Sequence, residues 1–168
     1  MTSLISIGPF EIQAKQREGF ISGNLWQEWV KKYPDIFDDD DHRLAQSQAH
    51  LGYHFYEWQA AVLLYEKMDY LSLVEKYQFK KHKRKQDIFL QRVSSLPRLL
   101  DLIARRKEHG YGVQCPDLFV YKRDNLTDWF FCEVKGPKEK IRDIQERYFY
   151  KIAKASGSHV RLLQFSVV

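Results

Sequence analysis

The sequence predicts an α/β fold in which helices flank a small mixed sheet, with a helical N-terminal half. Three observations support this prediction. The chain has 168 residues, which suits one domain with its own core. Hydrophobic residues make up 44% of it and aromatic residues 15%, as in a sequence that folds. Helical periodicity fills the middle of the chain, whereas short apolar segments typical of strands gather after residue 110.

The N-terminal part is expected to be an extension, residues 1–50, attached to a core of residues 51–168 within one domain. Residues 1–24 have no clear period and contain Gly and Pro turn signals. A short helix is expected over Leu25–Tyr33, before a proline that stops it. The acidic run Asp38–Asp41 could attract a metal, but such runs usually form solvated loops.

The middle of the chain is expected to be helical. Apolar residues recur with a period near 3.6 from Tyr56 to Tyr77, and this stretch has no Gly or Pro. A second helix is expected over Gln86–Glu108. It contains Pro97, which predicts a kink or break near Leu96.

The C-terminal part is expected to supply most of the sheet. Asp117–Tyr121 and Trp129–Lys135 are apolar segments separated by a polar turn, which predicts a β-hairpin. An amphipathic helix is expected over Lys138–Ala155, with Gly157 as its C-terminal cap. A final strand is expected over His159–Val168.

Composition also bears on location. No apolar run approaches the ~20 residues that span a bilayer. The first ten residues lack the charged and apolar regions of a signal peptide. We therefore expect an intracellular protein that does not enter a membrane. Its two cysteines, Cys115 and Cys132, are too few for a disulfide framework or a zinc cluster and are expected to be buried apolar residues.

Two carboxylates and an amine stand out in the predicted hairpin. Asp117 begins its first strand, Glu133 follows 16 residues later, and Lys135 comes two residues after that. The period of a strand puts Glu133 and Lys135 on one face, and the hairpin brings Asp117 to the same end. Acids within apolar strands need a partner or a metal. One alternative is a plain ion pair between Lys135 and a carboxylate.

The three side chains suit phosphodiester hydrolysis. Two carboxylate ligands, with the Val134 carbonyl as a third, would leave Mg²⁺ or Mn²⁺ open positions for water and a phosphate oxygen. Lys135 could orient or deprotonate the attacking water, or neutralise charge in the transition state. The sequence therefore predicts a metal-dependent nuclease.

A family resemblance agrees with this chemistry. The segments CPDLFVY and FFCEVKGPKEKIRDIQERYFYKIAKASGSHVRLLQF resemble the VRR-NUC branch of the PD-(D/E)xK nucleases, and especially the nuclease domain of Fanconi-associated nucleases. The resemblance covers roughly residues 110–166. It implies a restriction-endonuclease-like core that cuts branched, flapped or end structures in DNA. It also implies that Asp117 and Glu133 bind the metal and that Lys135 is the catalytic lysine.

The resemblance implies two further site residues. Gln145 would be the family's helix glutamine, and helical spacing puts it on the face turned to the sheet. The family also has a glutamate in a helix before the hairpin. Glu57 is our first choice as this catalytic and metal-binding residue, and Glu66 is the second. Either could instead be a solvated helix acid.

The net charge of +5 is unevenly distributed. Residues 1–49 hold five Lys/Arg against eight Asp/Glu, whereas residues 80–108 hold ten against three. Such a concentration suits contact with phosphates. The expected DNA-contacting residues are Lys80, Lys81, Lys83, Arg84 and Lys85 in the middle of the chain, and Lys138, Lys140 and Arg142 after the hairpin. Any one of them could instead be a solvated charge.

Several alternatives remain open at this point. A Holliday-junction resolvase or a restriction-type endonuclease would use the same chemistry. A non-catalytic DNA-structure-binding module, or a subunit of a nuclease complex, would bind DNA without cutting it alone. The protein could also act as a homodimer or with a partner protein.

Overall fold

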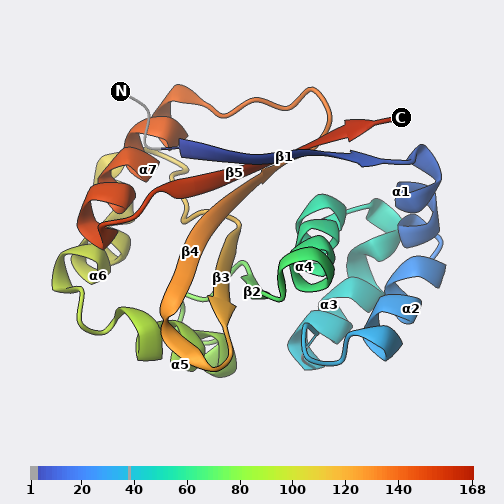
Figure 1. Ribbon diagram of the computed structural model, residues 1–168, viewed down its shortest axis with the longest axis horizontal. Helices are drawn as coiled ribbons and strands as arrows, with labels where there is room; N and C mark the ends of the chain where they lie inside the picture. The colour runs from blue at the N-terminus through green and yellow to red at the C-terminus, as the bar shows by residue number, and fades with distance from the viewer. Residues whose placement is uncertain (1–3, 38) are drawn as a thin grey trace.

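The computed structural model describes residues 4–37 and 39–168. Over these residues the chain forms a mixed α/β fold with a five-stranded sheet and seven α-helices (Figure 1). The strands are β1 (Leu4–Ile12), β2 (Leu71–Val74), β3 (Leu118–Lys122), β4 (Asn125–Lys135) and β5 (Val160–Val167). Their order in the sheet is β1-β5-β4-β3-β2. β5 is parallel to both β1 and β4, whereas β3 is antiparallel to both β4 and β2.

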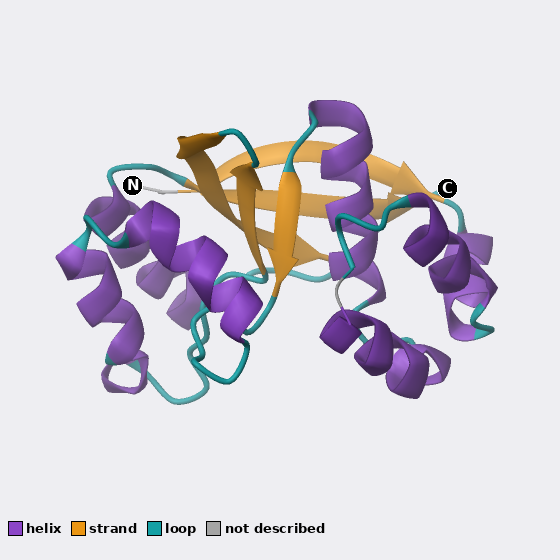
Figure 2. Ribbon diagram, turned by 90° about the horizontal axis from the view of Figure 1, so that it is seen from below, coloured by secondary structure: helices purple, strands orange, loops and turns teal. Residues whose placement is uncertain are grey.

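The helices lie in two groups on either side of strands β2–β4 (Figures 1 and 2). One group contains α1 (Ala14–Ile21), α2 (Asn24–Lys32), α3 (Asp39–Gln48) and α4 (Phe55–Met68). The other contains α5 (Lys83–Val93), α6 (Pro97–Ala104) and α7 (Asp143–Ser156). Short 3₁₀ turns follow α3 at Ala49–Leu51 and α6 at Arg106–His109. None of the helices in the described ranges is long and apolar enough to cross a membrane.

The predicted α/β class and the small mixed sheet are confirmed, but the N-terminal half is not purely helical. β1 pairs along its length with β5, from Leu4 beside Val160 to Ile12 beside Val167. The strand escaped prediction because it lies at the edge of the sheet, where most of its side chains are at least partly exposed and do not alternate. Residues 4–12, within the segment expected to be an extension, therefore pair into the central sheet.

The predicted helix from Tyr56 to Tyr77 is wrong in its second half. α4 ends at Met68, and Asp69 adopts a left-handed φ of 57°. The N–H of Tyr70 then bonds the Leu64 carbonyl at 3.1 Å, which closes the helix without a glycine or proline. The strand that follows, β2, is buried at all four positions and so shows no alternation that would reveal it.

Other predicted elements are confirmed. The hairpin forms from β3 and β4, with Leu118 opposite Cys132 and Tyr121 opposite Trp129. The helix expected over Gln86–Glu108 breaks where its proline begins α6. Gly157 ends α7 with a left-handed φ of 72°. α7 starts later than expected, at Asp143, because the preceding residues form a loop.

The acidic run, which was expected to be a solvated loop, forms the start of a helix instead. Asp39–Asp41 begins α3, and Asp38 lies outside the described residues. Asp41 is only 3% exposed, and its Oδ1 accepts a 2.6 Å bond from Lys85 Nζ. Both cysteines are buried and free, as expected. Burial raises the pKa of Cys115 to about 12, so its thiol is unreactive at neutral pH.

Candidate active site

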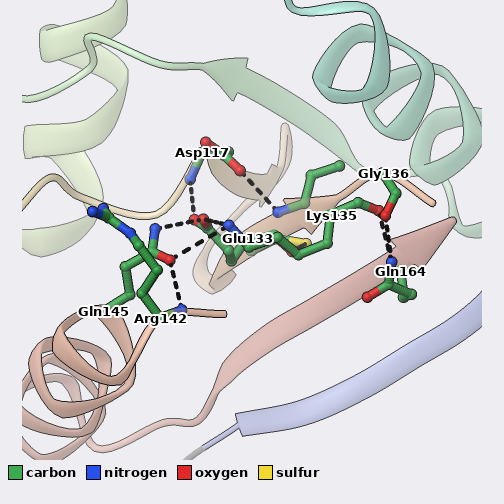
Figure 3. A network of polar contacts seen from close by, with 9 residues as sticks. Asp117, Glu133, Lys135, Gly136, Arg142, Gln145 and Gln164 are labelled. Carbon is green, nitrogen blue, oxygen red and sulfur yellow. Dashed lines mark hydrogen bonds and ion pairs between the residues drawn. The ribbon is translucent and has the colours of Figure 1, made fainter. Parts of the chain in front are cut away.

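Asp117 meets Glu133 and Val134 where the hairpin strands end. The antiparallel register pairs the next residue, Leu118, with Cys132. In this arrangement the Asp117 N–H donates to Glu133 Oε2 at 3.2 Å, and the Val134 N–H donates to Asp117 Oδ2 at 2.9 Å (Figure 3). The structure therefore brings together the two carboxylates and the backbone that sequence reasoning had assigned to a metal.

Lys135 and Gln145 complete the same network. Lys135 Nζ lies 3.0 Å from Glu133 Oε1, on the face of β4 that period two predicts. Gln145, in the first turn of α7, donates from Nε2 to Glu133 Oε1 at 3.2 Å. Its Oε1 lies 3.5 Å from Lys135 Nζ and accepts the Arg142 N–H at 3.1 Å (Figure 3). Gln145 thus orients both charged groups from the helix start.

The main chain around the two strand ends is fixed from both sides. Buried Tyr77 donates its hydroxyl to the Pro116 carbonyl at 2.7 Å. On the other strand, Gln164 of β5 donates from Nε2 to the carbonyls of Gly136 at 2.6 Å and Lys135 at 3.4 Å (Figure 3). A Cβ at Gly136 would lie 2.7 Å from the ring of Tyr56, so a larger residue directly after the lysine would force that ring to move.

Negative charge exceeds positive charge in this cluster. Burial, together with the carboxylates of Glu133 and Glu57, raises the pKa of Asp117 well above its usual value. Burial also raises the pKa of Glu133, although Lys135 opposes the shift. The pKa of Glu57 is raised by burial and by the nearby carboxylates of Glu75 and Glu133, although His54 opposes the shift. Without a further cation, these carboxyls therefore retain protons more readily than free ones do.

The chemistry of these donors suits a hard divalent cation, although among the described residues the ligand atoms that lie within 4.8 Å of one another are those of His54, Glu57 and Glu75. Asp117, Glu133 and Glu57 supply carboxylate oxygens, the ligands that Mg²⁺ and Mn²⁺ prefer. The Val134 backbone contacts Asp117, so its carbonyl belongs to the same strand end. A divalent ion would replace the protons that the crowded carboxyls otherwise hold, and Lys135 alone does not offset their charge.

The structure distinguishes between the two candidate helix glutamates. Glu57 lies in the first turn of α4, and its field affects the pKa of Asp117. Glu66 lies nine residues further, about 13.5 Å along the helix axis. Its carboxylate is exposed and lies 3.6 Å from Lys32 Nζ. Of the two, Glu57 is the one that approaches the site.

Glu57 has two polar neighbours, His54 and Glu75, and sequence reasoning missed Glu75 as a site residue. His54 Nδ1 lies 3.2 Å from Glu75 Oε1, and ligand atoms of all three side chains lie within 4.8 Å of one another. The Glu75 N–H also bonds the Asp117 carbonyl at 2.8 Å. Glu75 was hidden inside the helix expected over this segment. The short apolar run before it was the only signal of a strand ending at the site.

The acid–imidazole pair is electrostatically coupled. The hydrogen bond to Glu75 raises the pKa of His54. Burial alone would raise the pKa of Glu75, but the hydrogen bond and charge of His54 outweigh it and lower that pKa. The histidine is thus more easily protonated than usual, and its glutamate more easily ionised.

Most of the expected DNA-contacting residues are exposed. This group comprises Lys80, Lys81, Lys83 and Arg84 around the start of α5, and Lys138, Lys140 and Arg142 in the loop between β4 and α7. Lys85 is the exception, since it is only 4% exposed. Its amine donates to Asp41 Oδ1 and, at 2.7 Å, to the Val74 carbonyl, so it is not placed to contact DNA. Helical periodicity turns it to the core although its neighbours in sequence face solvent.

No protein-family model matches the chain, and no curated protein shows significant similarity to it.

Proposed function

We propose that the protein is a metal-dependent DNA nuclease of the PD-(D/E)xK type, with a restriction-endonuclease-like core. The observation that carries the proposal is the single network joining Asp117, Glu133, Lys135 and Gln145. Asp117 directly precedes β3, Glu133 and Lys135 lie on β4, and Gln145 lies in α7, so they meet at one end of the sheet. The segments that resemble VRR-NUC nucleases include these four residues.

Each residue has a role in the proposed reaction. The carboxylates of Asp117, Glu133 and Glu57, with the Val134 carbonyl, hold Mg²⁺ or Mn²⁺. When bound, such an ion supplies polarisation of the phosphate and a lowered pKa for water. Lys135 orients the attacking water or accepts its proton, while Gln145 holds the amine and the Glu133 carboxylate in register.

DNA is the substrate that best suits the charge around this site. The exposed lysines and arginines around the start of α5 and in the loop between β4 and α7 supply positive charge before the network's residues in sequence and between two of them. Such contacts position a nucleic acid and do not read its sequence. We therefore propose that the substrate is DNA with flaps, branches or ends, which the protein recognises by its structure. We also propose that the protein acts inside the cell. These exposed side chains could contact DNA equally well if the protein acted as a homodimer or with a partner protein.

The test is cleavage of 5′-flap, splayed-arm, four-way and plain duplex DNA with Mg²⁺, Mn²⁺ or chelator. Asp117→Ala and Lys135→Ala proteins are assayed beside the wild type, with Lys67→Ala as a control on the exposed side of α4. We expect metal-dependent cutting that both site variants abolish and the control retains. Preference for the four-way substrate would favour a junction resolvase. Binding of branched DNA without cutting in either metal would instead identify a non-catalytic module or a subunit that needs a partner.

A further inference from the structure

A pocket of about 380 Å³ lies beside the candidate site. Its wall includes His54 and Glu75, which also belong to the cluster around Glu57. Glu75 joins the two places directly, because its side chain lines the pocket while its N–H bonds the Asp117 carbonyl at 2.8 Å. Any group that occupies this pocket is therefore next to the proposed reaction centre.

Among the described residues, the pocket wall carries more basic than acidic side chains. Both acids on its wall have a cationic or ionisable partner, since Asp41 bonds Lys85 at 2.6 Å and Glu75 bonds His54 at 3.2 Å. Lys76 and Lys81 line the same pocket, and neither forms an ion pair within the described ranges. The charge of Lys76 also acts on Glu75, but neither amine is held in an ion pair within those ranges. Such amines favour an anionic ligand, and phosphate is the anion that a nuclease substrate carries.

The size and inner wall of the pocket indicate more than a phosphate group. Its volume lies near the lower end of the range for small-molecule sites, about 300–1,000 Å³. Trp58 and Val74 are apolar residues of the wall, although they are only 2% and 4% exposed. A single nucleotide combines the anionic and the apolar part that such a pocket requires. A double helix does not enter a space of this size, so the nucleotide must leave the base stack.

We propose that this pocket binds one unpaired nucleotide of the substrate strand, with its phosphate on Lys76 and Lys81 and its base toward Trp58 and Val74. This inference rests on the proposed nuclease function, because the ligand is taken as part of the DNA being cut. It gives a physical basis for preferring frayed, flapped or single-stranded DNA over intact duplex. The nucleotide pocket, made by the segment after β2 and by α3–α5, would select the strand structure before the carboxylates act on it.

The test uses dAMP, inorganic phosphate and deoxyadenosine as probes, in titration calorimetry with the full chain and with chelator present. We expect saturable dAMP binding that is weakened about tenfold in the Lys76→Ala/Lys81→Ala protein, from the loss of charge-assisted contacts. The matched control is Lys15→Ala/Lys67→Ala, which removes two exposed amines elsewhere. It should bind dAMP as the wild type does. Both inorganic phosphate and deoxyadenosine should bind more weakly than dAMP.

Three results would overturn the proposal. They are the absence of saturable dAMP binding to the wild type, equal binding by the Lys76/Lys81 variant, and inorganic phosphate binding as tightly as dAMP. The titrations contain neither metal nor DNA, so they are independent of cleavage. If dAMP binds through the two lysines but no DNA is cut, the nuclease proposal fails and the nucleotide pocket stands. If DNA is cut but these titrations fail, only the pocket is lost.

Discussion

Two buried lysine–carboxylate pairs lie in the described part of the chain, and they differ in what surrounds them. Lys85 Nζ is 2.6 Å from Asp41, and Lys135 Nζ is 3.0 Å from Glu133. Their side chains are similarly enclosed, at 5% and 3% exposed in the first pair and 11% and 4% in the second. Distance and burial alone would therefore give the two pairs the same role.

Their neighbours separate them. The Lys85 amine completes its bonding with the Val74 carbonyl, and so connects α3, β2 and α5. Around Lys135, by contrast, Asp117 and Glu57 add two carboxylates to that of Glu133, so the acids outnumber the amine. A paired charge stabilises an arrangement of elements, whereas a surplus of buried carboxylates calls for a ligand. The surplus is what distinguishes the candidate site.

The largest expected effect comes from removing the amine at the site. Methionine has about the length of lysine but no amine. Lys135→Met should therefore slow cleavage by about 10²–10⁴-fold, because it removes the general base or charge-neutralising group. Single-turnover rates at saturating Mg²⁺ measure this directly, with circular dichroism to show that the fold persists. Lys67→Met, an exposed substitution of the same kind on α4, is the control. A wild-type rate in Lys135→Met would remove the lysine from the mechanism.

The two pairs should respond to different extents when stability is measured. Lys85→Met leaves Asp41 buried without its nearest cation, and breaking such a pair typically costs about 3–5 kcal/mol of unfolding free energy. Lys135→Met should cost less, because Glu133 keeps its bonds from the Asp117 N–H and from Gln145. Urea unfolding with chelator present measures both changes.

A double variant controls for this contrast. Asp41→Leu/Lys85→Met replaces both charges with apolar groups and should recover much of the stability lost in Lys85→Met. Equal losses in Lys85→Met and Lys135→Met would contradict the distinction between a structural pair and a site pair. So would a double variant as unstable as the single one.

The candidate site was predictable where its signals are local. The hairpin follows from two apolar runs around a polar turn, and strand alternation then puts Glu133 beside Lys135. Gln145 follows from helical spacing, because α7 turns that position to the sheet. In these cases the distance along the chain and the period of one element determine the geometry.

Features that depend on distant pairing were not predictable in this way. β1 is specified by β5, more than a hundred residues away, and its own residues do not alternate. β2 is buried on both faces, so its four residues read as a continuation of α4. That error hid Glu75, and with it the pocket wall. Lys85 likewise looked like a DNA contact, because its partner Asp41 lies 44 residues away in what resembled a solvated acidic loop.

The two glutamates of α4 show the same contrast, because Glu57 belongs to the surplus of acids at the site and Glu66 is paired with Lys32. Glu57→Gln should weaken Mg²⁺ binding and cleavage by about 10–100-fold, as loss of a group supporting a metal site commonly does. Glu66→Gln should leave both within about twofold, because its exposed pair with Lys32 is far along the helix and screened by solvent. Metal titrations followed by thermal unfolding, with cleavage assays alongside, measure both variants. Equal effects would show that proximity to Asp117 does not define the ligand set.

The smallest expected effect is a gain in stability. Asp117→Asn keeps an oxygen for the Val134 N–H but removes one of the crowded charges. Because the folded-state pKa of Asp117 is raised, its contribution to stability is present below the unfolded pKa and lost as pH rises through the folded value. With chelator at neutral pH, the asparagine protein should therefore be more stable than the wild type, by about 1 kcal/mol of unfolding free energy, the size of a typical single-substitution effect.

The pH dependence and the metal dependence of this gain together test its cause. At pH values well below about 4, where aspartate is protonated in both folded and unfolded states, the difference between the proteins should vanish. Adding Mg²⁺ at neutral pH should stabilise the wild type far more than Asp117→Asn, because the ion offsets the charge that the substitution has removed. Asp101→Asn, which alters an exposed carboxylate paired with Arg105, should show neither response. A wild type that is the more stable protein in chelator would mean that Asp117 is satisfied by its neighbours, like Asp41, and that no cation is needed there.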